Sequence, residues 1–91
     1  MKIIISVDEN LKVIAGNPYG REIFDKCLKD KFSFDEENEL VFPDNVRIVC
    51  SSFFQGLFSN LLENHTPEQI YSKIKIIPER LEKNLKQGLF E

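Results

Sequence analysis

The sequence predicts an α/β fold, a small mixed β-sheet of four to five strands covered by about three helices. Short β-branched runs recur along the chain, and the segments between them carry apolar residues at helical spacing. Pro, Gly and Asn residues separate the two kinds of segment. The chain has 91 residues, which corresponds to a single domain over residues 1–91.

The beginning of the chain predicts two strands joined by a tight turn. Residues 2–7 read KIIISV and residues 11–16 read LKVIAG, and both are apolar runs of strand length. Only the polar cluster at residues 8–10 separates them. We therefore expect a β-hairpin.

Residues 17–30 change to a helical period. Asn17 is a favourable N-cap and Pro18 suits the first helical position. Gly20 weakens the first turn by about 1 kcal/mol relative to Ala, so we interpret it as a point of close backbone approach. The charged segment 29–39 follows and is interpreted as a solvated connector. One apolar stripe is expected to be buried, formed by Tyr19, Ile23, Phe24, Cys27 and Leu28.

The second half of the chain continues the alternation of strands and helices. Thr66, Pro67 and Gln69 form the pattern of a capping box at the start of a short helix. Because helices alternate with strands after an initial hairpin, the sheet is predicted to be mixed rather than fully parallel. The predicted elements are strands at 39–42 and 73–77, and helices at 51–64, 65–72 and 78–91, while residues 46–50 are either a short strand or the extended lead into the next helix. The helix at 51–64 has an apolar stripe formed by Phe53, Phe54, Leu57, Phe58, Leu61 and Leu62.

The charge and hydropathy of the chain argue against two classes of partner. The net charge is −3 and the Lys and Arg residues form no basic cluster, so we expect neither nucleic acid nor an anionic membrane surface as a ligand. No apolar run approaches the roughly 18 residues of a membrane helix. The apolar run at residues 3–5 is too short for the hydrophobic region of a secretory signal. We expect a cytoplasmic protein, a monomer or a weak homodimer that pairs through an exposed strand edge.

The cysteines and the single histidine indicate no metal, cofactor or disulfide. Cys27 and Cys50 are interpreted as reduced core residues, and Cys50 as a buried, inert thiol. Cys50 lacks the Arg six residues later that an oxyanion-binding cysteine loop needs, since position 56 is Gly. His65 stands alone, without ligands at zinc spacing, and is expected to be a surface or capping residue. The four glycines are dispersed, so they predict no phosphate-binding loop.

Two serines between an apolar run and an aromatic helix are the main candidate site. Ser52 and Gln55 have the spacing of a capping box, which leaves Ser51 without a role. A phosphate on either serine would also be favoured at a helix N-terminus. Arg21 is either an anion or partner contact or a solvated helix residue. Gln55, Ser59 and Asn60 form either a partner surface or a solvated face.

The order of these segments resembles a known family. Residues 46–58, VRIVCSSFFQGLF, preceded by ELVFPDN at 39–45, are similar to the STAS-like domain family of small bacterial and phage-borne proteins of unassigned function. That family is related to the anti-sigma-factor antagonists. The segment GNPYGREI at 16–23 is similar to the Gly-Arg segment that opens the family's first helix, and residues 73–87 fit its last strand and helix.

The resemblance implies a non-enzymatic regulatory domain. In the antagonists a histidine-kinase-like ATPase binds beside the second helix and phosphorylates a serine at its start, which matches Ser52, with Ser51 before it. This sequence departs from the antagonists at three positions. Cys50 and Phe42 stand where they carry Asp, and Phe53 stands where they carry Gly, which weakens the case for phosphorylation.

The function predicted from these observations is partner switching through protein binding. The expected contact residues are Ser51, Ser52, Gln55 and Arg21. Two alternatives stay open. One is a phage or mobile-element protein that modulates a host defence or replication enzyme, and the other is a small hydrolase that uses Ser or Cys, for which no G-x-S-x-G motif is present.

Overall fold

The main sheet consists of three parallel strands in the order β1-β3-β5, which are β1 (Lys2–Ile4), β3 (Asn38–Val41) and β5 (Ile74–Ile77). A separate two-stranded ribbon joins β2 (Val13–Ile14) to β4 (Ile48–Val49), also in parallel. These elements come from a computed structural model that describes every residue from Met1 to Glu91.

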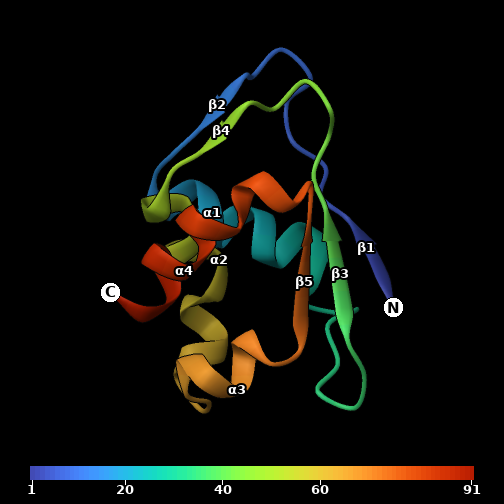
Figure 1. Ribbon diagram of the computed structural model, residues 1–91, viewed down its shortest axis with the longest axis vertical. Helices are drawn as coiled ribbons and strands as arrows, with labels where there is room; N and C mark the ends of the chain where they lie inside the picture. Colours follow the sequence, from blue (N-terminus) through green and yellow to red (C-terminus); the bar gives the residue numbers. More distant parts are fainter.

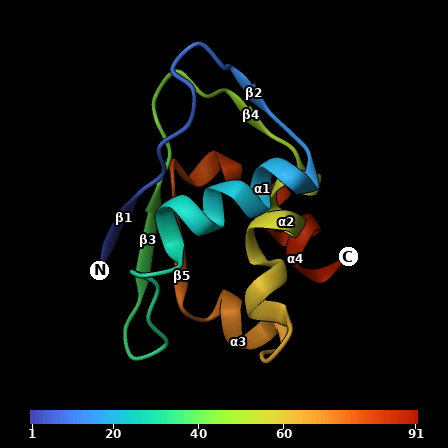
Figure 2. The ribbon, with the colours of Figure 1, turned by 180° about the vertical axis from the view of Figure 1, so that it is seen from behind.

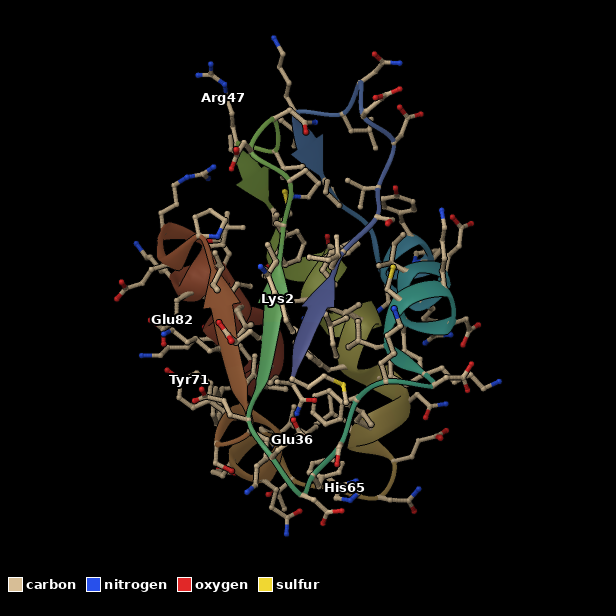
Figure 3. The ribbon with its side chains drawn as sticks, turned by 90° about the vertical axis from the view of Figure 1, so that its right-hand side faces the viewer. Lys2, Glu36, Arg47, His65, Tyr71 and Glu82 are labelled. Carbon is tan, nitrogen blue, oxygen red and sulfur yellow. The ribbon has the colours of Figure 1, made fainter.

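The helices lie on one side of the main sheet, while the ribbon projects at one end of the molecule (Figures 1 and 2). The opposite face of the sheet carries no helix, as Figure 3 shows. None of the helices combines the length and apolar character needed to cross a membrane. The helices are α1 (Asn17–Ile23), which continues as a π-helical turn (Phe24–Leu28), α2 (Ser51–Leu62), α3 (Pro67–Tyr71), and α4 (Glu82–Phe90), which follows a 3₁₀ turn (Glu79–Leu81).

The α/β class is confirmed, but the single mixed sheet and the N-terminal hairpin are wrong. The chain instead builds two successive units, β1-β2-α1 and β3-β4-α2, whose strands pair with each other in parallel. This arrangement buries Ile3 beside Leu40 and Ile14 beside Val49. A helix lies in each connection between the main strands, as parallel pairing requires.

The core forms where α2 packs between the sheet and its neighbouring helices. Four residues of the apolar stripe predicted for this helix, Phe53, Phe54, Leu57 and Phe58, are fully buried, and Leu61 and Leu62 are half-buried. The ring of Phe42 lies 6.2 Å from that of Phe53 and 5.9 Å from that of Phe54, centroid to centroid. The core therefore joins the end of β3 to the start of α2.

The connector at 29–39 is partly buried, whereas its charges predicted a solvated segment. Phe32 and Phe34 are half-buried, and Asn38 is fully buried. The Asn38 side chain accepts a hydrogen bond from the Ser33 N–H at 3.1 Å and donates to three carbonyls, those of Ser33, Glu36 and Lys73. One amide thus holds the connector against the main sheet.

The two predicted helix starts had different outcomes. The Thr66 capping box is confirmed, because the Gln69 N–H donates to Thr66 Oγ1 at 3.1 Å and the Thr66 N–H donates to Gln69 Oε1 at 2.9 Å. Asn17 is not the N-cap of α1. Gly16 takes that position with φ of 100°, a conformation that favours glycine. Asn17 is already helical, so the helix begins one residue earlier than a cap at Asn17 would place it.

Candidate functional site

The two serines lie in the first turn of α2, but they do not cap it. Cys50 occupies the N-cap position with an extended backbone (φ −71°, ψ 152°) and makes no capping bond through its side chain. The predicted capping box between Ser52 and Gln55 is therefore wrong. The helix starts early because the Phe53 N–H already bonds the Cys50 carbonyl, which places both serines inside the helix.

Ser52 instead connects α2 to the turn that precedes α1. Its Oγ accepts a hydrogen bond from the Gly16 N–H at 3.0 Å, across 36 positions of sequence. Both serines are half-buried. The hydroxyl that the family resemblance matched to a phosphoacceptor is therefore the acceptor of a hydrogen bond between two segments of the fold.

The start of α2 is enclosed by α1 on one side and α4 on the other. A Cβ on Gly20 would collide with the Phe53 carbonyl and lie 2.6 Å from the Leu57 nitrogen, so the close approach predicted at Gly20 is confirmed. A Cβ on Gly56 would collide with the Asn17 carbonyl. On the α4 side, a Cβ on Gly88 would lie 2.5 Å from the Ser51 carbonyl.

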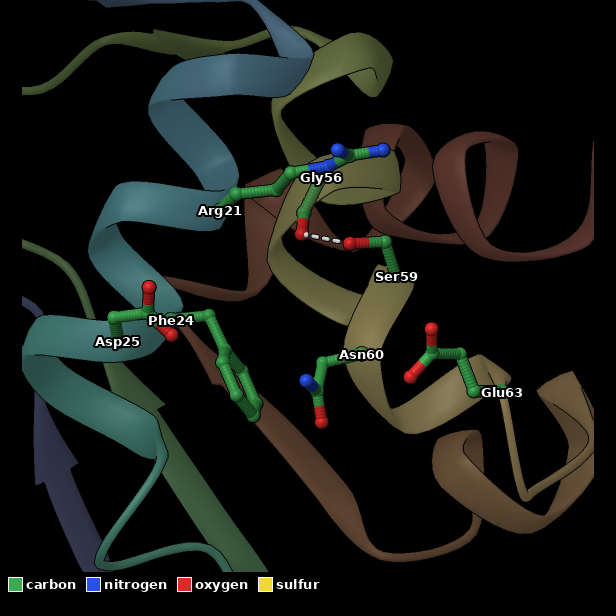
Figure 4. A pocket seen from close by; sticks show the side chains of 7 residues that line it. All are labelled: Arg21, Phe24, Asp25, Gly56, Ser59, Asn60 and Glu63. Carbon is green, nitrogen blue, oxygen red and sulfur yellow. Dashed lines mark hydrogen bonds between the residues drawn. The ribbon is translucent and has the colours of Figure 1, made fainter.

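This close packing leaves a polar pocket of about 300 Å³ along the seam between α1 and α2 (Figure 4). Gly56 forms its upper part, beside the Arg21 side chain, and Ser59 donates to the Gly56 carbonyl at 2.9 Å. Only one lining residue is hydrophobic. The lining residues are Arg21, Phe24, Asp25, Gly56, Ser59, Asn60 and Glu63.

The charged side chains of this pocket are unpaired. Arg21, Asp25 and Glu63 are exposed, and the one salt bridge of the molecule joins the N-terminus to Glu36 elsewhere. The guanidinium and both carboxylates therefore have their charges available to a ligand or partner. We name this surface, from Ser52 and Gln55 to Glu63 on α2 together with Arg21 and Asp25, the α1–α2 face.

The structure divides the predicted site residues into two neighbouring groups. Ser51, Ser52 and Gln55 share the first turns of α2, and Gln55 is exposed. Arg21 lies on the other helix, α1, beside Gly56 and Ser59 of α2. Asp25 and Glu63 were not predicted, although each stands four residues after a predicted member, Arg21 or Ser59, and so falls on the same helical face.

His65 and the cysteines lie outside this site. His65 is half-buried, with its ring stacked on Phe34 at 4.0 Å between centroids and its Nδ1 3.3 Å from the Leu61 carbonyl. It follows the C-terminal end of α2, about 18 Å along the helix axis from the serines, so it cannot serve them as a base. Cys27 and Cys50 are both free thiols, as predicted, and Cys50 is half-buried rather than buried.

Comparison with known proteins gives one match. A family model described as a STAS-like domain of unknown function (DUF4325) matches residues 19–83, from α1 to the beginning of α4. No curated protein and no solved structure matches the chain. The match includes the helices and strands that form the α1–α2 face, and the chain belongs to the family of STAS-like domains of unknown function.

Proposed function

We propose that this domain is a non-enzymatic regulatory module that binds another protein through the α1–α2 face. The observation that carries the proposal is the unpaired charge of Arg21, Asp25 and Glu63 around a shallow polar pocket. Exposed charges of both signs on packed helices suit a complementary protein surface, because they direct encounter and set specificity.

The rigidity of this face supports the same role. Gly20 and Gly56 bring the backbones of α1 and α2 into contact, and Ser52 fixes the start of α2 to Gly16. The two helices therefore present their side chains in one relative position. Because the face is preformed, the domain loses less conformational entropy when a partner binds to it.

The class of partner comes from the family resemblance rather than from the pocket. In the related antagonists, a histidine-kinase-like ATPase contacts the start of the second helix, and we propose such an ATPase as the partner here. Phe42 and Phe53 replace the Asp and Gly of the antagonists and are core residues, 2% and 0% exposed. The acidic side chains around the pocket of this face are Asp25 and Glu63, at positions other than the two where the antagonists carry Asp.

Ser52 is the residue at which phosphorylation would act on the complex. A phosphate there would compete for the place where the hydroxyl meets Gly16, and it would add negative charge beside Gln55 on the binding face. The proposal therefore predicts that the phosphorylated or Ser52→Asp protein binds its partner more weakly. Asp keeps an oxygen that can accept from the Gly16 N–H, so the fold is expected to persist.

The test is a tagged pull-down from the native host that identifies the bound protein and measures the mass of the bait. Wild type is compared with Ser52→Asp and with Lys75→Gln, which changes the net charge by the same unit on the open face of the sheet. We expect an ATPase with wild type and Lys75→Gln, and less of it with Ser52→Asp. Equal recovery with all three baits would refute the assigned surface, and a nuclease or replication enzyme with an unmodified bait would favour the phage or mobile-element role.

A further inference from the structure

The two edges of the β2–β4 ribbon differ. Side chains from the C-terminal part of the molecule cover the β4 edge. Arg80 donates to the carbonyls of Val46 and Arg47, at 2.7 and 2.5 Å, and Asn84 Nδ2 donates to the Val49 carbonyl at 2.8 Å. This edge is therefore closed to another strand.

The β2 edge has no such cover. On the inner edge, the residues on either side of β4 donate to this strand. The Arg47 N–H donates to the Lys12 carbonyl and the Cys50 N–H donates to the Ile14 carbonyl, each at 2.8 Å. Since backbone groups alternate along a strand, the N–H and C=O of Val13 point away from β4. No hydrogen bond outside the ladder uses them. In both Figure 1 and Figure 2, β2 lies along the outer margin of the ribbon.

The side chains beside this open edge are apolar and exposed. Val13 is 51% exposed and Ile48, its cross-strand neighbour, is 49% exposed. Ala15, which directly follows β2, is also exposed. An unpaired edge with an apolar face is a site for strand addition.

We propose that β2 pairs antiparallel with β2 of a second copy of this chain, with Val13 opposite Val13 of the copy. The two residues would exchange both N–H···O bonds across a two-fold axis, which gives a four-stranded sheet in the order β4-β2-β2-β4. The exposed pair of Val13 and Ile48 would then join its copy in one apolar cluster.

The side-chain pairs of this register favour a second copy as the occupant. Val13 would face Val13, and Lys12, which directly precedes β2, would face Ile14, so no like charges meet directly. The contact is short and belongs among weak, transient interfaces.

The free edge of β5 offers no comparable register. The carbonyls of Lys73 and Ile77 bond to β3, so the backbone groups of Ile74 and Ile76 face outward. Pairing Ile74 with Ile76 of a copy would set Lys75 against Lys75, which is unfavourable. Pairing Ile76 with itself would set Pro78, which has no N–H, against Ile74. The homodimer edge is thus better placed at β2 than at residues 73–77.

The test is sedimentation equilibrium of the purified full chain over a wide concentration range. Wild type is expected to dimerise reversibly at high concentration. Val13→Lys sets two Lys residues opposite each other and should raise the dimer dissociation constant by about tenfold or more. Val13→Pro removes the edge donor, which bonds nothing within the protomer, and should have a similar effect.

Ile4→Lys is the matched control, because Ile4 is equally exposed, at 53%, but lies in the other sheet. It should leave the dissociation constant unchanged, and circular dichroism should show all variants folded. A wild-type protein that stays monomeric at every concentration overturns the proposal. So does a dimer that survives both Val13 variants, or one that is lost with Ile4→Lys. Loss of a bound partner protein in Val13→Pro, with no wild-type dimer, would assign the edge to that partner instead. None of these results depends on the α1–α2 face.

Discussion

The hydroxyl of Ser52 is expected to contribute to stability as well as to binding. Ser52→Ala removes the acceptor of the Gly16 N–H, and an unsatisfied, partly buried donor costs about 1–3 kcal/mol of unfolding free energy. Urea denaturation measures this loss. Ser59→Ala is the control, since Ser59 only donates to a helical carbonyl one turn earlier, and it should change stability by less than about 0.5 kcal/mol. An equal effect of both variants would contradict the role of the Gly16 contact.

Asn38 is the residue on which the charged connector depends most. Its side chain makes four hydrogen bonds and is fully buried. Asn38→Ala is expected to lower the unfolding free energy by about 2–4 kcal/mol, because several buried backbone groups lose their partners. Asn60→Ala, at an exposed Asn, should have little effect in the same denaturation experiment. If Asn38→Ala were as stable as wild type, the connector would not rely on this amide.

Residue types alone could not show whether Ser52 caps α2 or bonds to a distant segment. The spacing of Ser52 and Gln55 is that of a capping box, but the bond is made by Gly16, which is 36 positions away. Asn17 was misplaced for a related reason, because Gly16 adopts a positive φ that sequence patterns do not report. The Thr66 box was predictable because all of its partners lie within three residues.

At the scale of elements, the glycine contacts between α1 and α2 set the geometry of the α1–α2 face. Gly20→Ala and Gly56→Ala would each drive a methyl group into the opposite helix backbone, and should cost about 3 kcal/mol or more. Gly16→Ala meets no atom within 4 Å, so only the backbone strain of φ 100° and ψ 131° opposes it, at about 1–3 kcal/mol. Thermal unfolding of the three variants gives the ranking, and a Gly16→Ala variant less stable than the other two would contradict it.

Helix identity was predictable at this scale, whereas strand pairing was not. The apolar stripe of α2 follows from periodicity, and its four innermost residues are all fully buried. The partner of each strand depends instead on contacts across more than 30 residues, such as Val13 with Ile48. A short polar turn at residues 8–10 favours a hairpin locally, and the turn itself forms, with Asp8 accepting from the Asn10 N–H. The burial of Ile3 beside Leu40 and of Ile14 beside Val49 stabilises the parallel arrangement instead.

At the scale of the whole molecule, three surfaces differ in the groups that they expose. The α1–α2 face carries unpaired charges, the β2 edge carries unpaired backbone groups, and the outer face of the main sheet carries Lys2, Glu39 and Lys75 in register. Of the predicted site residues, Ser52, Gln55 and Arg21 lie on the first of these surfaces. Asp25 and Glu63 escaped prediction because only the packing of α1 on α2 brings them around one pocket.

The most direct test of the proposed function is a titration of the recovered partner protein, once purified, against the wild-type domain and its variants. Arg21→Ala and Ser52→Asp are each expected to raise the dissociation constant by about tenfold, or about 1.4 kcal/mol, while Lys75→Gln leaves it unchanged. That result would place the partner on the α1–α2 face. Equal affinity for all four proteins, with each variant folded, would contradict the proposal and direct attention to another surface.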